Sequence, residues 1–223
     1  MSGDKRKPQV QDRQRINDHF EGRAVMKRDF SQPVLKAVRK LASQKPLDTR
    51  LTEQRNPRST RIDELSTIEI VDLINAEDRM VAAAVGEERQ QIARAIDLVV
   101  DCFHKGGRLI YVGAGSSGRL GVLDATEMPP TYRCDPEMVQ GIIAGGFEAL
   151  VRSQEGAEDH PEEGAAAIDE KNVGANDFVL GIATSGTTPF VHGALKRARE
   201  RGARTGFLLC PIRPSNSSSR MTW

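Results

Sequence analysis

Residues 108–132 read RLIYVGAGSSGRLGVLDATEMPPTY, and this stretch decides the predicted fold. It begins with an apolar strand over 108–115, turns sharply in GAGSSG, and continues as a short helix over 117–127 that Pro129 and Pro130 close. A strand, a glycine-rich turn and a helix form one unit, in which the free N–H groups of the helix face the turn and favour an anion. GAGSSG also fits the G-x-G-x-x-G pattern of dinucleotide-binding turns.

Strands and helices alternate beyond this unit. A helix is expected over 187–202, with one or two more between 147 and 170, and further strands over 137–146, 176–186 and 203–210. This alternation predicts right-handed crossovers and an α/β fold with a doubly wound parallel sheet. Runs such as VLGIA are apolar on both faces, as expected for a sheet that is covered by helices on both sides.

The charge pattern divides the chain into three parts. Residues 1–47 hold twelve Lys/Arg against five Asp/Glu, although the whole chain has a net charge of only +1. We expect a basic, flexible extension over 1–47, which is more typical of a solvated arm than of a nucleic-acid-binding platform because aromatic residues are sparse. The globular domain is expected over 48–210 and includes N-terminal helices that start at the Ser66–Glu69 capping box and at 87. An irregular tail follows over 211–223.

Composition favours a cytoplasmic enzyme or binding protein without a metal. No apolar run is long enough to span a membrane, and the N-terminus lacks the apolar core of a signal peptide. The three cysteines form no C-x-x-C pair and the four histidines no H-E-x-x-H motif, so neither a disulfide framework nor a metal site is expected. No membrane or nucleic-acid partner is expected either.

Two hydroxyl-rich loops follow two of the predicted strands. In the first, glycines shape the turn and two serines add donors; in the second, threonines and a serine surround a glycine, again between a strand and a helix. Hydroxyl groups at a helix N-terminus suit a compact phosphate, and both loops would lie at the carboxyl ends of strands, where ligands bind in such folds. The alternative is that these residues are ordinary helix N-caps. The residues concerned are Gly115, Ser116, Ser117, Thr184, Ser185, Gly186, Thr187 and Thr188.

A dinucleotide is disfavoured at the first loop. Such a site needs an acidic residue at the end of the next strand, about twenty residues beyond the glycines. The next strand ends in IIAGG (142–146), which carries no carboxylate, and Glu127 comes too early in the chain. A nicotinamide oxidoreductase is therefore the least favoured function.

Two carboxylates are candidates for acid–base work. Glu127 precedes two prolines, which would hold it on a stiff turn, an arrangement suited to proton transfer. Glu158 lies in EGAED, where neighbouring carboxylates repel one another and favour a proton carrier. The alternative for EGAED is a solvated helix start, since acidic residues favour first turns.

Several long motifs occur in the same order as in a known family. TEQRNPRSTRIDELSTIEIVDLIN, GAGSSGRLGVLDATEMPPTY, MVQGIIAGG, EGAED and GIATSGTTPFVHGAL lie between 51 and 210. In these motifs the chain resembles the N-acetylmuramic acid 6-phosphate etherases of the sugar-isomerase (SIS) superfamily. The resemblance implies a SIS-type, flavodoxin-like three-layer sandwich. The glucokinase regulatory protein is a more distant relative that keeps the fold and sugar-phosphate recognition without catalysis.

The resemblance implies a carbon–oxygen lyase that acts in cell-wall recycling. Its substrate would be N-acetylmuramic acid 6-phosphate, and its products N-acetylglucosamine 6-phosphate and D-lactate. The family's general acid corresponds to Glu127, and its second catalytic glutamate to Glu158, which we assign as the base that removes the C2 proton. Elimination and water addition by two carboxylates require no metal and no cofactor.

The resemblance also implies the substrate contacts and the assembly. Phosphate contacts correspond to Ser116, Ser117, Ser185 and Thr187, with Gly115 and Gly186 shaping the loops and Thr184 close by. Glu53 and Asn56 in TEQRN would help to close the site, across the interface of a homodimer.

The chain departs from the family pattern at both ends. The basic N-terminal extension is not part of that pattern, and the family continues beyond the fourth strand with a further strand and a helical region. Only SSSRM (217–221) resembles a motif of that region. We therefore expect a C-terminally shortened etherase, with a non-catalytic sugar-phosphate-binding regulator or an inactive truncated etherase as the alternatives.

Overall fold

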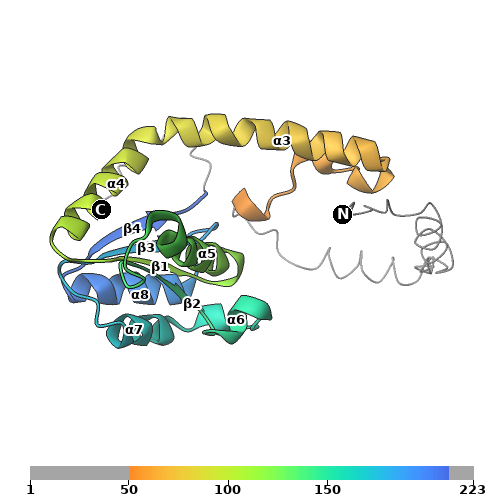
Figure 1. Ribbon diagram of the computed structural model, residues 1–223. Helices are drawn as coiled ribbons and strands as arrows, with labels where there is room; N and C mark the ends of the chain where they lie inside the picture. The colour runs from red at the N-terminus through yellow and green to blue at the C-terminus, as the bar shows by residue number, and fades with distance from the viewer. Residues whose placement is uncertain (1–50, 211–223) are drawn as a thin grey trace, which may run out of the picture. The chain divides into compact units, whose positions relative to one another are not determined.

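The computed structural model describes residues 51–210, and Figure 1 shows the arrangement of their elements. The expected extension over 1–47 and the expected tail over 211–223 lie outside the described residues. The helices are η1 (Leu51–Glu53), η2 (Pro57–Ser59), η3 (Ile62–Glu64), α3 (Thr67–Glu87), α4 (Arg89–His104), α5 (Gly115–Tyr132), α6 (Glu148–Val151), η4 (Ala157–Asp159), α7 (Pro161–Glu170) and α8 (Pro189–Glu200). The strands are β1 (Leu109–Gly113), β2 (Val139–Ile143), β3 (Phe178–Ile182) and β4 (Arg204–Leu208).

The four strands form one parallel sheet in the order β2-β1-β3-β4. From β1 the chain crosses to β2 on one side and then returns to β3 on the other. The order therefore reverses between β1 and β3, which are hydrogen-bonded neighbours. In open α/β sheets this switch point is where the connections diverge and leave a crevice for a ligand.

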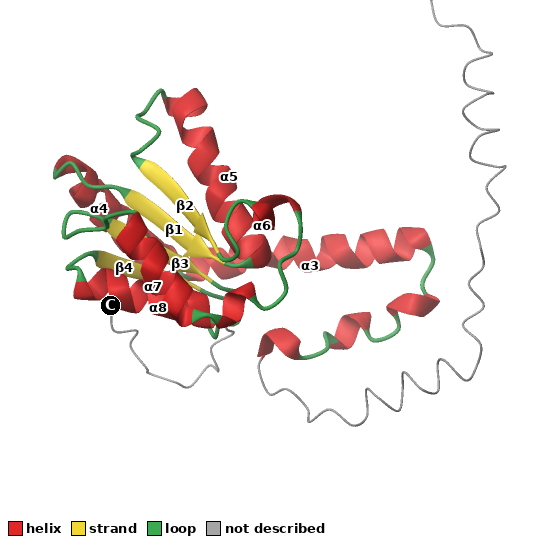
Figure 2. Cartoon of the chain, turned by 90° about the horizontal axis from the view of Figure 1, so that it is seen from below, coloured by secondary structure: helices red, strands yellow, loops and turns green. Residues whose placement is uncertain are grey.

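Helices cover both faces of the sheet. One face packs against α7 and α8 through Ile110, Val112 and Val179, and the other packs against α4 and α5 through Leu109 and Phe178. Successive residues of a strand point to opposite faces, so the apolar run of β1 supplies both cores. Figure 2 views the domain from the side of α7 and α8, which lie in front of the strands. The predicted doubly wound, three-layer sheet is confirmed.

The helix that follows the first loop is longer than predicted. We expected a helix over 117–127 closed by two prolines, but α5 continues to Tyr132 with Pro129 and Pro130 inside its last turns. A proline has no N–H and cannot form the helical hydrogen bond to the carbonyl four residues back. The helix ends at Arg133, which has a left-handed backbone conformation and whose N–H donates to the Pro129 carbonyl at 2.8 Å. Glu127 therefore lies on a helix and not on a stiff turn.

The helix α3 begins where the sequence predicts. The backbone N–H of Ser66 donates to the Glu69 carboxylate at 2.7 Å, which completes the capping box. The hydrogen bond from the Ser66 side chain, and then this backbone bond, lower the pKa of Glu69. Arg58 on η2 pairs with Glu77 at 2.8 Å and fastens the preceding turns to α3. No residue of α3 is buried among the described residues, and several of its apolar side chains are exposed: Ile68, Val71, Ile74, Val81 and Val85.

The helices α7 and α8 are in close contact because each carries a glycine where they cross. A Cβ atom on Gly193 would lie 1.9 Å from the Pro161 carbonyl oxygen, and one on Gly164 would lie 2.0 Å from the Phe190 carbonyl oxygen. Real Cβ atoms do not approach oxygen this closely, so only glycine allows this spacing. The short helix η4 also packs against α8, so the position of η4 depends on how closely α7 and α8 pack.

Replacing Gly193 with alanine should therefore push α7 and α8 apart. We expect the free energy of unfolding to fall by about 2 kcal/mol, as for other overpacked cores. Gly86→Ala is the matched control, because nothing lies within 4 Å of a Cβ there and alanine should stabilise α3 by about 0.5–1 kcal/mol. Urea unfolding measures both, and equal midpoints for Gly193→Ala and the parent protein would contradict the packing argument.

Candidate functional site

The two hydroxyl-rich loops lie next to each other. The first follows β1 and the second follows β3, and the last residues of these strands, Gly113 and Ile182, pair in the sheet. Both loops therefore lie at the switch point, at the carboxyl ends of the strands. The sequence predicted hydroxyl groups at strand ends, and the strand order decides that these two ends are neighbours.

The first loop uses its three glycines in two ways. Gly115 has φ of +51°, a conformation that favours glycine, and it starts α5. Gly113 and Gly118 pack against each other, because a Cβ on either would lie less than 3 Å from the backbone of the other. This contact brings the first turn of α5, with Ser116 and Ser117, directly onto the end of β1. The N–H groups of that turn offer a positive electrostatic potential to an anion.

The second loop has its own internal hydrogen bonds. The Ser185 and Thr187 hydroxyl oxygens lie 2.9 Å apart, and the Thr187 N–H donates to Ser185 Oγ at 3.3 Å. Gly186 has φ of +72°, and its carbonyl lies 2.7 Å from His192 Nε2 on α8. Sequence reasoning missed His192, because a single histidine inside a helix carries no motif. Thr184 is exposed, and its carbonyl accepts the Cys210 N–H at 3.1 Å.

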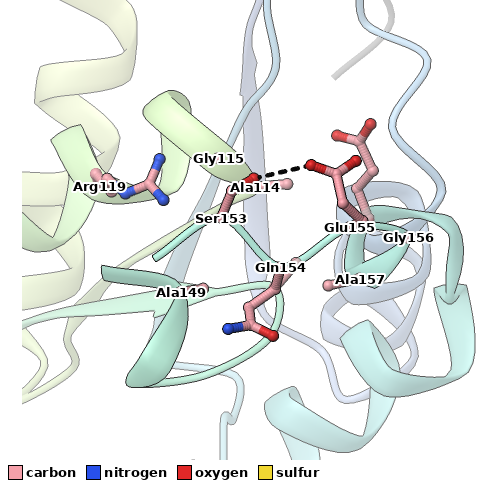
Figure 3. A pocket seen from close by; sticks show the side chains of 11 residues that line it. Ala114, Gly115, Arg119, Ala149, Ser153, Gln154, Glu155, Gly156 and Ala157 are labelled. Atoms are coloured by element: carbon pink, nitrogen blue, oxygen red, sulfur yellow. Dashed lines mark hydrogen bonds between the residues drawn. The ribbon is translucent and has the colours of Figure 1, made fainter. Parts of the chain in front are cut away.

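A pocket lies between the start of α5 and the connection from β2 to α7. Figure 3 shows side chains from both sides that border it, and Glu158 is also among its lining residues. Gly145 and Gly146 turn the chain after β2, both with positive φ, and a Cβ on Gly145 would lie 3.0 Å from Gln154, so the connection packs closely beneath the pocket. The lining residues are Ala114, Gly115, Arg119, Ala144, Ala149, Ser153, Gln154, Glu155, Gly156, Ala157 and Glu158.

Charged groups of both signs surround this pocket. Ser153 Oγ donates to Glu155 at 3.2 Å, and the Arg119 Nε donates to the Leu150 carbonyl at 3.1 Å (Figure 3 shows the Ser153 bond). His160, two residues after Glu158, lies 3.0 Å from Glu162, and the pKa of His160 is raised by this hydrogen bond and by nearby carboxylates. Sequence reasoning missed Arg119 and Ser153, while Glu155 was noted only as a carboxylate neighbour of Glu158.

Glu127 lies apart from this pocket. It is exposed on α5, twelve residues beyond Gly115, and twelve residues of α-helix rise by about 18 Å. Its neighbour Asp124 accepts a hydrogen bond from the Tyr111 hydroxyl at 2.7 Å, which ties this part of α5 to β1. Burial and this bond raise the pKa of Tyr111. Within one chain, the pocket therefore contains Glu158 without Glu127.

Glu53 and Asn56 lie on the turns that precede α3. Glu53 is exposed, and Asn56 caps η2 by accepting the Arg58 N–H at 2.9 Å. Neither residue lines the pocket.

The strand β2 ends at Ile143 and is followed by Ala144, Gly145 and Gly146, so the position of a ribose-binding acid carries no carboxylate. Over residues 51–210, no three His, Cys, Asp or Glu side chains gather as metal ligands would. Within the same range, no helix is both long and apolar enough to cross a membrane.

Comparison with known proteins identifies relatives over most of the described domain. Residues 91–199 match the family model of the glucokinase regulatory protein N-terminal SIS domain. The chain is 57% identical over 160 residues to an N-acetylmuramic acid 6-phosphate etherase from Crocosphaera subtropica, with 72% of this chain and 52% of the relative covered. Similarly named proteins from Synechococcus elongatus (58% over 160 residues, 72% and 52% covered) and Rhodopirellula baltica (57% over 159 residues, 71% and 53% covered) also match. The chain spans about half the length of these curated relatives.

A solved structure shares the fold. Phosphoheptose isomerase from Neisseria gonorrhoeae superposes with a TM-score of 0.52 at 21% identity, covering 65% of this chain and 75% of the isomerase. Together with the family model, this match shows that the domain has an α/β fold of the SIS type. The resemblance to the N-acetylmuramic acid 6-phosphate etherases is confirmed.

Proposed function

We propose that this chain, as a relative of the N-acetylmuramic acid 6-phosphate etherases, is a carbon–oxygen lyase of cell-wall recycling in the cytoplasm. It would cleave the D-lactyl ether of N-acetylmuramic acid 6-phosphate and release N-acetylglucosamine 6-phosphate and D-lactate. The observation that carries the proposal is the adjacency of the two hydroxyl-rich loops at the switch point, with the Glu158 pocket beside the first of them.

In this proposal the loops hold the sugar phosphate. Ser116 and Ser117 in the first turn of α5 would donate to the phosphate oxygens, together with Ser185 and Thr187 of the second loop. The positive φ values of Gly115 and Gly186 support a close backbone approach to the ligand. Thr184 is exposed on the same loop and would extend this set of donors.

The chemistry needs two proton carriers and one water molecule. The sugar opens to its aldehyde, which acidifies the C2 proton, and the Glu158 carboxylate removes that proton. The C3–O bond then breaks while Glu127 protonates the departing lactate oxygen, which leaves an unsaturated aldehyde. Water adds to C3, and the C2 proton returns. The sum is hydrolysis of the ether, and each proton that a glutamate gains or loses is restored within the cycle.

A second copy of the chain would complete this site. The position of Glu127, about 18 Å along α5 from Gly115, supports a site to which Glu127 comes from a partner. Exposed apolar side chains on the described helices support a homodimer, since such surface favours burial against another chain. These side chains include Ile96 and Val100 on α4 and Leu120 and Leu123 on α5. Glu53 and Asn56 would then approach the site across the interface.

Release of D-lactate from N-acetylmuramic acid 6-phosphate tests the proposed function. We expect the purified chain to release D-lactate and N-acetylglucosamine 6-phosphate in equal amounts, measured with an enzyme-coupled lactate assay. Binding of the sugar phosphate without lactate release would instead identify a non-catalytic sugar-phosphate-binding protein, for which the match to the glucokinase regulatory protein domain provides support. Absence of sugar-phosphate binding would contradict both functions.

A further inference from the structure

Arg119 is a cation at the pocket that the proposed mechanism does not use. It lies in the second turn of α5, five residues after Ala114 at the N-cap, and its side chain is partly buried. Its Nε donates to the Leu150 carbonyl at 3.1 Å, which fixes the guanidinium plane. In Figure 3 the guanidinium extends from α5 toward Ser153, and Arg119 is one of the residues that line the pocket.

Arg119 differs from the arginines of the domain that form ion pairs. Arg108 pairs with Asp177, Arg197 with Asp169 and Arg204 with Asp101. Within residues 51–210, by contrast, no ion pair joins Arg119 to a carboxylate, although Glu155 and Glu158 line the same pocket. An anionic ligand would be repelled by these two glutamates unless a cation offset their charge, and Arg119 is the cation among the described lining residues.

The second anionic group of the proposed substrate fits this position. The hydroxyl-rich loops account for the phosphate, and the remaining anion of N-acetylmuramic acid 6-phosphate is the carboxylate of its lactyl ether. A guanidinium presents two parallel N–H groups that match a carboxylate, which a point charge such as an ammonium does not. Resting on the proposed function, we propose that Arg119 binds the lactyl carboxylate and makes the site prefer the ether to the same sugar phosphate without lactate.

The test compares two ligands that differ by the lactyl group. Calorimetric titration of the full chain with N-acetylmuramic acid 6-phosphate and N-acetylglucosamine 6-phosphate is made in the Glu158→Gln background, in which turnover is strongly slowed. Adding Arg119→Gln should weaken binding of the ether by about tenfold or more, as expected for a charge-assisted bond, and change binding of the plain sugar phosphate by less than about twofold. Arg119→Lys should give an intermediate loss.

Arg89→Gln is the matched control, because Arg89 also donates to a backbone carbonyl, that of Gly86 at 3.3 Å, but lies outside the pocket. It should alter neither affinity. If the hydrogen bond from Arg119 to the Leu150 carbonyl only supports the structure, Arg119→Gln should weaken binding of both ligands alike. An equal loss of affinity for both ligands therefore overturns the proposal, and so does no loss for either. If the Glu158→Gln protein binds neither ligand, the proposed function fails as well. If the Glu158→Gln protein binds both ligands with equal affinity, the proposed role of Arg119 is wrong and the proposed function still stands.

Discussion

Replacing Glu158 with glutamine should lower the rate of lactate release by about 10²–10⁴-fold, the contribution typical of a general base. Glutamine keeps the size of the side chain and cannot accept the C2 proton. Glu127→Gln should cause a loss of similar size, because the lactate oxygen would leave without a proton. The initial rate of lactate formation at saturating substrate measures both, and sugar-phosphate binding by the variants shows that the loops remain intact.

Mixing the two inactive variants tests whether one site uses both chains. If Glu127 and Glu158 of one site come from different copies, a mixed dimer of Glu127→Gln and Glu158→Gln contains one complete site. Random exchange of subunits in a symmetric dimer would then restore about a quarter of the parent activity. If both glutamates of a site come from the same chain, mixing restores nothing, and the proposed sharing of the site is wrong. If either variant releases lactate at the parental rate, the glutamate replaced in that variant has no part in the mechanism.

The second large effect is expected at Asp177, far from the pocket in sequence and buried at the start of β3. Only 5% of Asp177 is exposed. Its carboxylate accepts hydrogen bonds from the Arg108 guanidinium (2.8 and 3.1 Å), from the Arg108 N–H (2.8 Å) and from the Gly174 N–H (2.9 Å). It thereby joins the residue before β1 to the turn before β3.

Asp177→Asn should lower the free energy of unfolding by about 3 kcal/mol, because it leaves the partly buried Arg108 charge without its partner. Burial alone would raise the pKa of Asp177, but the hydrogen bonds from Arg108 and Gly174 outweigh it and lower the pKa. A lowered folded-state pKa adds stability above the unfolded-state pKa near 4, and this stability disappears as the pH falls through the folded-state pKa. The difference between parent and variant should therefore be full at pH 7 and shrink below about pH 4.

Urea unfolding at several pH values measures this difference. Asp135→Asn is the matched control, since Asp135 also accepts a backbone N–H, that of Glu137 at 2.8 Å, but lies on an exposed turn. It should change stability by less than about 0.5 kcal/mol. A difference for Asp177→Asn that does not depend on pH between 7 and 3 would show that the charge of Asp177 contributes little.

Much of the fold is predictable from local sequence patterns. The apolar runs at 109–113 and 178–182 form strands at the predicted places, the Ser66–Glu69 box starts α3, and Pro189 starts α8. These signals act within a few residues, because a strand alternates its side chains and a helix end must satisfy its own N–H groups. The end of α5 was predicted wrongly, since the local preference of two prolines to stop a helix was weaker than the packing of α5 on β1 and β2.

The sequence by itself determined which chemical groups this protein offers to a ligand: hydroxyl-bearing loops after two strands, a glycine turn that favours an anion, and the glutamates in DATEMPP and EGAED. The tertiary structure decided which of these groups meet. The strand order places the two loops side by side, the turn at Gly145 and Gly146 brings Glu158 and Glu155 to the start of α5, and Arg119 gains its place through the Leu150 carbonyl. This proximity depends on contacts between residues far apart in the chain, and local sequence patterns do not predict such contacts.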